Sequence, residues 1–159
     1  MADLCCEYSI AGIIINDDTP GVNRLMTSFE NGHVLGLDGA PLRAEIDPQG
    51  QSDGGIVHTK FFGPRIITFQ GETHIQSAEF SDLTTYLTAL NTLEAAVITA
   101  LEGIRNTPST LAWTPTGLSA KSISVTYGTE GGEIQFDGPP VPGQRTFQFT
   151  LVAAEPAIS

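Results

Sequence analysis

The chain has few of the side chains that usually identify a cross-linked, membrane-bound or catalytic protein. Of 159 residues, only two are cysteines, two are methionines and one is tryptophan. Cys5 and Cys6 are adjacent, so they cannot join distant segments and are expected as free thiols at a frayed end, in a reducing compartment. No apolar run is long enough for a membrane span, and the first residues lack a secretory signal, so no membrane contact is expected.

Positive charge is also scarce. Seven Lys and Arg stand against 18 Asp and Glu, which gives a formal net charge of −11. An acidic surface repels the phosphates of duplex DNA and of anionic membranes, so specific nucleic-acid binding is not expected. Taken alone, the excess of acid is explained most simply by solubility.

The sequence shows no constellation for catalysis or for metal or cofactor binding. His33, His58 and His74 lack a Cys, His or Asp partner at metal-ligand spacing, so surface or strand-edge positions are expected for them. The stretch 47–53 has the wrong acidic alternation for a calcium loop and lacks the closing Glu. There is neither a nucleophile elbow nor a phosphate-binding glycine loop. The sequence therefore predicts no enzyme, no metal and no cofactor.

What is present is turn residues and β-formers. Seventeen Gly, ten Pro and many β-branched residues indicate about eight to ten short strands. The expected strands are 8–15, 22–29, 42–46, 56–62, 65–70, 111–113, 119–127, 133–136 and 144–153. Turns or loops are expected at 16–21, 30–39, 47–55 and 138–143. The stretch 129–132 is expected to turn a hairpin between strands 119–127 and 133–136.

The strand 65–70 has two distinct faces. Ile67 and Phe69 share an apolar face, whereas Ile66, Thr68 and Gln70 share a face that becomes polar toward its end. Gly71 is expected to close this strand with a turn.

One amphipathic helix interrupts the strands at about 81–106. Ser81 is the expected N-cap, Asp82 favours the first turn, and Pro108 follows the end. The apolar stripe consists of Leu83, Leu87, Leu90, Leu93, Val97, Leu101 and Ile104. Many β-branched residues and Gly103 make its intrinsic propensity mediocre, so this helix should form only when packed against the rest of the domain. The order of elements predicts a single domain, 1–159, of class α+β and mainly β.

The order of elements also resembles the N-terminal domain of the distal tail proteins of long-tailed bacteriophages. The matching features are the early strand with Tyr8-Ser-Ile-Ala-Gly-Ile, the glycine loop at 53–55, the strand 65–71, the Leu-rich helix, a hairpin, and the ending 147–156, where a strand runs into a proline. The resemblance covers roughly residues 6–156. It implies a tail-tube-like β-barrel or sandwich with the long helix packed on its flank.

The resemblance further implies a structural role in the virion tail. Six copies would form a ring at the tip of the tail tube, joining it to hub or receptor-binding proteins, after assembly in the host cytoplasm. Distal tail proteins often carry a second, carbohydrate-binding-like domain, whereas this chain stops at Ser159, which is expected of a minimal adaptor. The alternative within this class is a major tail tube subunit.

For such a ring the acidic composition gains a second interpretation. Carboxylates facing the channel would keep DNA phosphates off the wall during passage. The candidate channel-facing residues are Glu45, Asp47, Asp53, Glu72, Glu130, Glu133 and Asp137. Open strand edges would join the copies, with 22–29, 56–62 and the hairpin 122–136 as candidates; ordinary pairing within one chain is the alternative for each.

Two interpretations from other classes stay open. A small carbohydrate-binding or adhesion module would use exposed Trp113, Tyr127 or Tyr86 to stack on sugars. A hydrolase would use paired carboxylates such as Glu130 and Glu133, although a hairpin turn explains this pair more simply.

Overall fold

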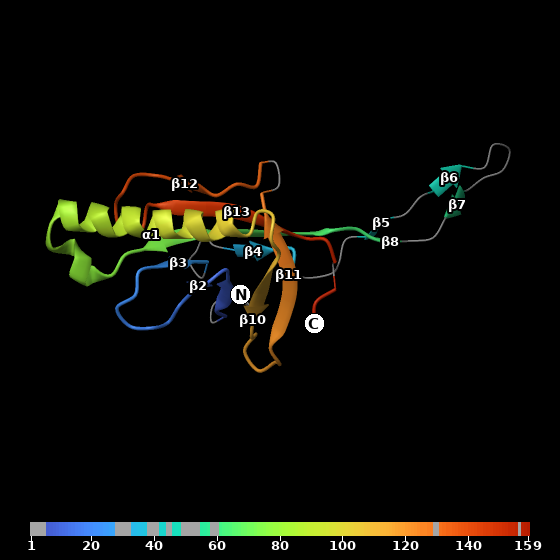
Figure 1. The fold of residues 1–159 in the computed structure, drawn as a ribbon, viewed down its shortest axis with the longest axis horizontal. Helices are drawn as coiled ribbons and strands as arrows, with labels where there is room; N and C mark the ends of the chain where they lie inside the picture. Colours follow the sequence, from blue (N-terminus) through green and yellow to red (C-terminus); the bar gives the residue numbers. More distant parts are fainter. Residues whose placement is uncertain are drawn as a thin grey trace.

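The computed structural model describes residues 6–27, 33–37, 42–43, 46–48, 55–57, 61–128, 131–155 and 157–159. Within these residues the chain forms a nine-stranded antiparallel sheet, two separate two-stranded ladders and one long helix (Figure 1). The strands are β1 Tyr8–Ile10, β2 Ile13–Ile15, β3 Arg24–Met26, β4 His33–Leu35, β5 Leu42–Arg43, β6 Ile46–Pro48, β7 Gly55–Val57, β8 Phe61–Phe62, β9 Arg65–His74, β10 Ser109–Trp113, β11 Lys121–Tyr127, β12 Gln135–Asp137 and β13 Thr146–Ala153; the helix is α1 Leu83–Gly103. The expected α+β class, mainly β with one helix beside a nearly closed barrel, is confirmed.

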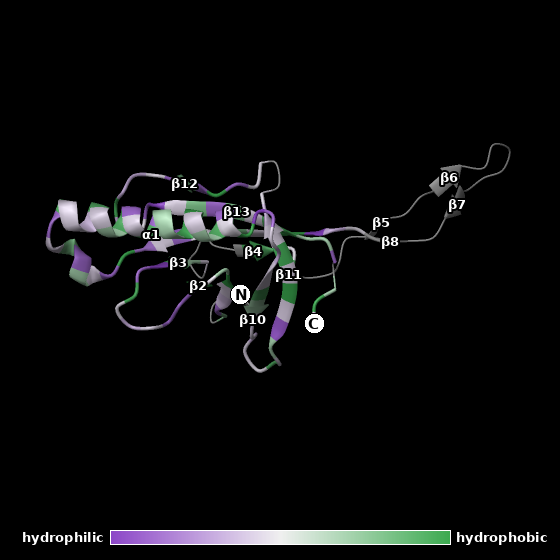
Figure 2. Cartoon of the chain, in the orientation of Figure 1, coloured by the Kyte–Doolittle hydropathy of each residue, from purple (hydrophilic) through white to green (hydrophobic). Residues whose placement is uncertain are grey.

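Two long strands, β9 and β13, form the centre of the sheet. They pair antiparallel from Glu72 opposite Thr146 to Arg65 opposite Ala153. The other edge of β9 carries β3 and β4 one after the other, and the other edge of β13 carries β12 and β11. Hydrophobic and hydrophilic residues alternate along β13, as Figure 2 shows, because successive side chains point to opposite faces of the sheet.

The sheet curls until its two ends meet at Asn16. From β13 it continues through β11, β10 and β1 to β2. The Asn16 backbone N–H donates to the Leu25 carbonyl at 2.9 Å, and its side-chain Nδ2 donates to the Cys6 carbonyl at 3.0 Å. The side-chain oxygen accepts from the Thr27 N–H at 2.7 Å. Asn16 has a φ of 62°, which asparagine tolerates better than most residues. One residue thus links β2 to β3 and nearly closes the barrel.

The segment 8–15, expected as a single strand, is a hairpin instead. Ile10 of β1 lies opposite Ile13 of β2, so Ala11 and Gly12 alone form the turn. Their φ values, 50° and 82°, are both positive, as in the type I′ turn whose twist suits a hairpin. Because β-branched residues lie on both sides of Ala11 and Gly12, the sequence pattern indicates one continuous strand and not a turn.

Three further expectations fail because strands find partners that the sequence pattern did not indicate. The stretch 30–39 contains β4, which pairs with β9 through Val34 opposite Phe69. β12 does not form a hairpin with β11: Gln135 lies opposite Gln148, so β12 pairs with β13 across the proline-rich loop 138–143. Likewise, the ends of the expected loop 47–55 belong to β6 and β7, which pair with each other.

Gly71 does not close β9, which continues to His74. A side chain at this position would collide with the Met26 carbonyl and approach the Thr27 Cα atom. The glycine therefore allows the backbone of β3 to approach β9 closely. Such close approach, rather than a turn, explains the glycine inside this strand.

The core fills the barrel and continues beneath α1. The side chains of Ile67, Phe69 and Phe149 lie in one buried cluster with Val97 and Leu101 of the helix. Tyr86 and Leu90 pack with Ile75 just beyond the end of β9. The helix is thus held by packing, as its weak propensity predicts. Cys6, expected at a frayed end, is buried in this core because Tyr8 and its neighbours carry β1 into the barrel.

The helix begins two residues later than expected, at Leu83, and ends at Gly103 rather than near 106. Asp82, not Ser81, is the N-cap: its carboxylate accepts from the Thr85 N–H at 2.7 Å and from the Thr85 hydroxyl at 3.1 Å. Leu83, assigned to the apolar stripe, is 68% exposed because the first turn extends past the sheet.

We expect the Asp82 cap to make stability depend on acid pH. The Thr85 N–H and then its hydroxyl hold the pKa of Asp82 below its ordinary value of 3.8. A lowered folded pKa stabilises the fold fully above pH 3.8 and loses that contribution as the pH falls through the folded value. Asp82→Ala should lower the melting temperature at neutral pH, and Asp82→Asn, which still caps, should lower it less.

Thermal unfolding measured at pH 7 and at pH 3 tests this prediction. The difference between wild type and Asp82→Asn should shrink on acidification. Because Asp17 and Glu102 also have lowered pKa values in both proteins, the comparison isolates the single carboxylate. A difference that widens toward pH 3 would contradict the assignment of Asp82 as the titrating cap.

Candidate functional site

The side chains of β9 and β13 that point away from the core form a partly exposed surface, which we call the outer face. Its rows follow from the strand register and run across two to four strands. Beginning at the α1 end of β9, the rows are Arg24–His74, then Met26–Glu72–Thr146–Asp137, then His33–Gln70–Gln148–Gln135, then Leu35–Thr68–Thr150, and last Ile66–Val152–Thr126.

The chemistry of the outer face changes in steps along the strands. A row with a cation and an imidazole is followed by a row with two carboxylates, a row with three amides and His33, a row with two hydroxyls, and a row that is apolar except for Thr126. The Thr68 and Thr150 hydroxyls are 3.3 Å apart and hydrogen-bonded. Ile66 is 55% exposed, and Leu35 is exposed beside it. Among the described side chains of these rows, charge is therefore confined to one end of the face, and the others are neutral.

The row of two carboxylates contains two of the seven predicted acidic residues. Glu72 and Asp137 both lie opposite Thr146, on either side of β13, so about two strand spacings, roughly 10 Å, separate them. Glu133 is exposed just before β12. Glu45, Asp53 and Glu130 lie outside the described residues, as does the Asp47 side chain, so the hydrolase pair also falls there. Whether any of these carboxylates faces a channel stays a prediction.

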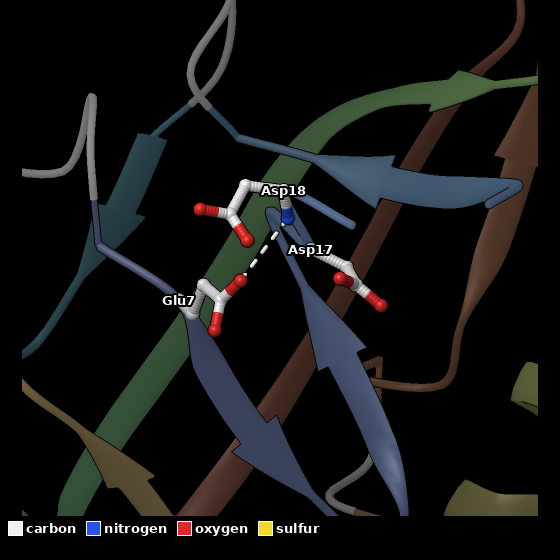
Figure 3. Close-up of side chains that lie close together, drawn as sticks. All are labelled: Glu7, Asp17 and Asp18. Carbon is white, nitrogen blue, oxygen red and sulfur yellow. Dashed lines mark hydrogen bonds between the residues drawn. The ribbon is translucent and has the colours of Figure 1, made fainter. Parts of the chain in front are cut away.

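A second group of carboxylates, which the sequence pattern did not single out, surrounds the turn after β2. Oxygens of Glu7, Asp17 and Asp18 lie within 4.8 Å of one another (Figure 3). The Asp18 N–H donates to Glu7 Oε1 at 3.0 Å, and the Thr19 hydroxyl and N–H lower the pKa of Asp17. These hydrogen bonds account for the cluster: its short carboxylate side chains accept from backbone N–H groups and so stabilise the turn. Only the hairpin of β1 and β2 brings Glu7 to it.

An ion pair fastens α1 to the sheet where β13 begins, beside the Thr73 end of β9. Arg145 Nε donates to Glu94 Oε1 at 2.7 Å, and Nη2 donates to Oε2 at 3.2 Å, while Nη1 donates to the Gly138 carbonyl at 2.9 Å. The guanidinium also lies 5.9 Å from the centre of the Phe136 ring. The hydrogen bonds to Glu94 raise the pKa of Arg145. This two-pronged pair ties the helix to β12, β13 and their loop.

We expect Glu94→Ala to destabilise the fold by about 2 kcal/mol, between the values for exposed and for buried pairs. The pair is mostly shielded, so the substitution leaves the Arg145 cation short of acceptors. Chemical denaturation measures the effect, with Glu102→Ala as control, since that residue pairs with Arg105 on the exposed end of the helix. Equal losses in the two variants would show that the Glu94 pair is no more than a surface contact.

The three aromatic side chains predicted to form a sugar-stacking platform cannot do so. Trp113, Tyr127 and Tyr86 are all buried in the core. The Tyr127 hydroxyl accepts from the Ile134 N–H at 2.7 Å, and Arg105 lies over its ring. Their burial follows from the alternation of β10 and β11 and from the inward face of α1. The carbohydrate interpretation thereby loses its original residues.

Of the three histidines, His74 alone has a described side chain. It is half-buried at the end of β9, opposite Arg24 of β3. Burial, and then the charge of Arg24, lower its pKa from the ordinary value. Among the described residues, none of the helical segments combines the length and the apolar character that crossing a membrane requires.

Comparison with known proteins finds similarity of fold but no match to a sequence family. No protein-family model matches the chain, and no curated protein sequence is close enough to count as a relative. Among solved structures, the fold is similar to that of SPP1 Dit (gp 19.1), described as a paradigm of the hub adsorption apparatus in phages that infect Gram-positive hosts. The TM-score is 0.58 at 11% identity, and the match covers 95% of this chain. The chain spans 50% of the length of that protein.

Proposed function

We propose that this chain is a structural subunit of the tail of a long-tailed bacteriophage, and that its copies form a ring at the distal end of the tail tube. The observation that supports the proposal most is the fold likeness to SPP1 Dit over nearly the whole chain. In this proposal residues 1–159 are one tail-tube-like domain, with its core at about 6–156, and its role is structural rather than catalytic. The ring lies in the virion, is assembled in the host cytoplasm, and joins the tube to hub or receptor-binding proteins.

The strand edges of the sheet support assembly from copy to copy. In the described part of the chain, β12 pairs with β13 alone and β4 pairs with β9 alone. These edges lie on opposite sides of the central pair, so β12 of one copy can pair with β4 of the next. Such pairing would satisfy open backbone groups and repeat around a closed ring. β12 belongs to the predicted edge 122–136, whereas β4 was not among the predicted edges.

The outer face supports a role as the wall of a channel. If β12 and β4 join neighbouring copies, the rows of the outer face continue around the ring. Glu72 and Asp137 would then form one acidic collar, followed by a neutral wall of amides and hydroxyls. Carboxylates repel DNA phosphates. Neutral groups do not bind phosphates by displacing their counterions, so DNA could pass along this wall without being held.

Electron microscopy of the purified protein tests ring formation. Negatively stained particles should show sixfold rings, and light scattering after size exclusion should give six times the 16.8 kDa chain mass. Long stacked tubes would favour the alternative, a major tail tube subunit. A strict monomer, both at high concentration and in particles from the parent phage, would overturn the ring.

A charge reversal tests the channel. The double variant Glu72→Lys/Asp137→Lys should make assembled rings retain short duplex DNA in a salt-sensitive manner, because the collar becomes basic. The matched control Glu79→Lys/Glu155→Lys makes the same change in net charge away from the outer face. Retention of DNA by the control alone, or equally by both variants, would show that the outer face does not line the channel.

A further inference from the structure

An open cavity of about 480 Å³ lies at the basic end of the outer face. The turn after β2, the ends of β3 and β9, and the loop at 142–143 form its walls. Its volume is in the usual range of small-molecule sites. The proposed ring does not require this cavity, so its role is a separate question.

Two opposite charges line the cavity without pairing. Among the arginines whose side chains are described, Arg24 alone donates no hydrogen bond from its guanidinium; Arg65, Arg105 and Arg145 all donate. Arg24 Nε is buried and has no acceptor within the described residues. The Asp18 carboxylate accepts no hydrogen bond from them and forms no salt bridge with Arg24. A donor and an acceptor of full charge are therefore both available to a ligand.

Neutral polar groups and an aromatic ring complete the lining. His74 has a lowered pKa, caused by burial and then by Arg24, so its imidazole is uncharged at neutral pH and can donate or accept. Gln76 and Ser77 add an amide and a hydroxyl. Phe80 is 44% exposed, and its ring is fixed by an edge contact with Tyr86 at 5.4 Å between centroids. This cavity thus has a flat apolar surface beside several hydrogen-bonding groups.

We infer that this cavity binds a neutral saccharide, with one face of a pyranose ring against Phe80 and its hydroxyls shared between Asp18 and Arg24. Hydroxyls both donate and accept hydrogen bonds, so one sugar satisfies both charged groups. An anionic ligand would be repelled by Asp18, and a cationic ligand would be repelled by Arg24. The C–H face of the ring gives Phe80 an apolar partner. This site differs from the buried aromatic trio that the sequence suggested.

Titration by two-dimensional NMR of the ¹⁵N-labelled chain tests the inference. The methyl glycosides of glucose, galactose and N-acetylglucosamine, each up to about 50 mM, should include at least one with a dissociation constant on the order of 1 mM. The backbone amides of Asp18, Arg24, His74 and Phe80 should shift. Phe80→Ala and Asp18→Asn should each weaken binding about tenfold, and Leu118→Ala, exposed outside the cavity lining, should not.

The design separates a saccharide from other ligands. The same spectra report whether each variant keeps its fold, and Asp18→Asn changes charge with almost no change in volume. Absence of shifts with all three glycosides would overturn the inference, as would shifts that survive both cavity variants. A stronger response to sodium acetate at equal concentration would also overturn it, pointing instead to a carboxylate of a partner protein. None of these outcomes bears on ring formation, which microscopy tests separately.

Discussion

Phe149→Ala is expected to destabilise the fold by about 3–5 kcal/mol, the usual loss for a buried phenylalanine. Phe149 lies in β13 at the centre of the core, 1% exposed. Its ring stacks on Phe69 with centroids 5.1 Å apart and contacts Phe147 at 6.0 Å. Removing the ring leaves a cavity in the core beneath the two long strands, whose paired backbones hold each other and cannot collapse inward.

Urea denaturation followed by intrinsic fluorescence gives the free energy of unfolding. The matched control is Thr150→Ala, one residue along the same strand but on the outer face. That variant loses only the hydroxyl contact with Thr68, so its cost should be about 1 kcal/mol or less. Similar losses at the two positions would mean that the two faces of β13 are not distinguished as core and surface.

Gly71→Ala is expected to destabilise the fold by about 3 kcal/mol, at the upper end for an added methyl group in a packed site. The added Cβ atom would meet the backbone of β3 at the Met26 carbonyl, and backbone yields less readily than the end of a flexible side chain. The strain should separate β3 from β9 and weaken the barrel closure that Asn16 completes.

Gly103→Ala provides a control with the opposite expected sign. Gly103 is the last residue of α1, and an added Cβ atom there meets no atom within 4 Å. Alanine should therefore stabilise the helix by about 0.5–1 kcal/mol through propensity and reduced freedom of the unfolded chain. Melting temperatures of the two variants measured under one buffer condition compare them directly. A neutral result at Gly71 would show that β3 can shift without cost.

The period-two pattern of strand 65–70 predicted the two faces of β9 correctly, and β11 and β13 show the same alternation. Ile67 and Phe69 are buried in β9, as are the odd-numbered residues of β11 and β13 from Ile123 and Phe147 onward. Face assignment needs only local alternation, which the chain itself records. The helix was predicted for the same reason, although the cap moved by one residue because Asp82 reaches Thr85.

The pairing partners of the strands could not be predicted from local alternation. β12 lies between β11 and β13 in the sequence and can form a hairpin with either, so nearness in sequence does not decide between them. The function of Gly71 depends on Met26, a residue of another strand. The candidate sites share this origin: Glu72 and Asp137 meet only through the β13 register, and Arg24 reaches His74 only because β3 pairs with β9.

The central pair of strands also determines when the barrel can exist during folding. Thr68 and Thr150 are neighbours in the sheet but 82 residues apart in the chain. Closing a flexible loop of that length costs about 4 kcal/mol of chain entropy before any contact repays it. Contacts of such separation slow folding, and β9 acquires its β13 partner only after β13 has left the ribosome. The helix is made in that interval, and its Val97 and Leu101 belong to the same buried cluster as Ile67 and Phe69, so it is available to cover part of the apolar face of β9 first.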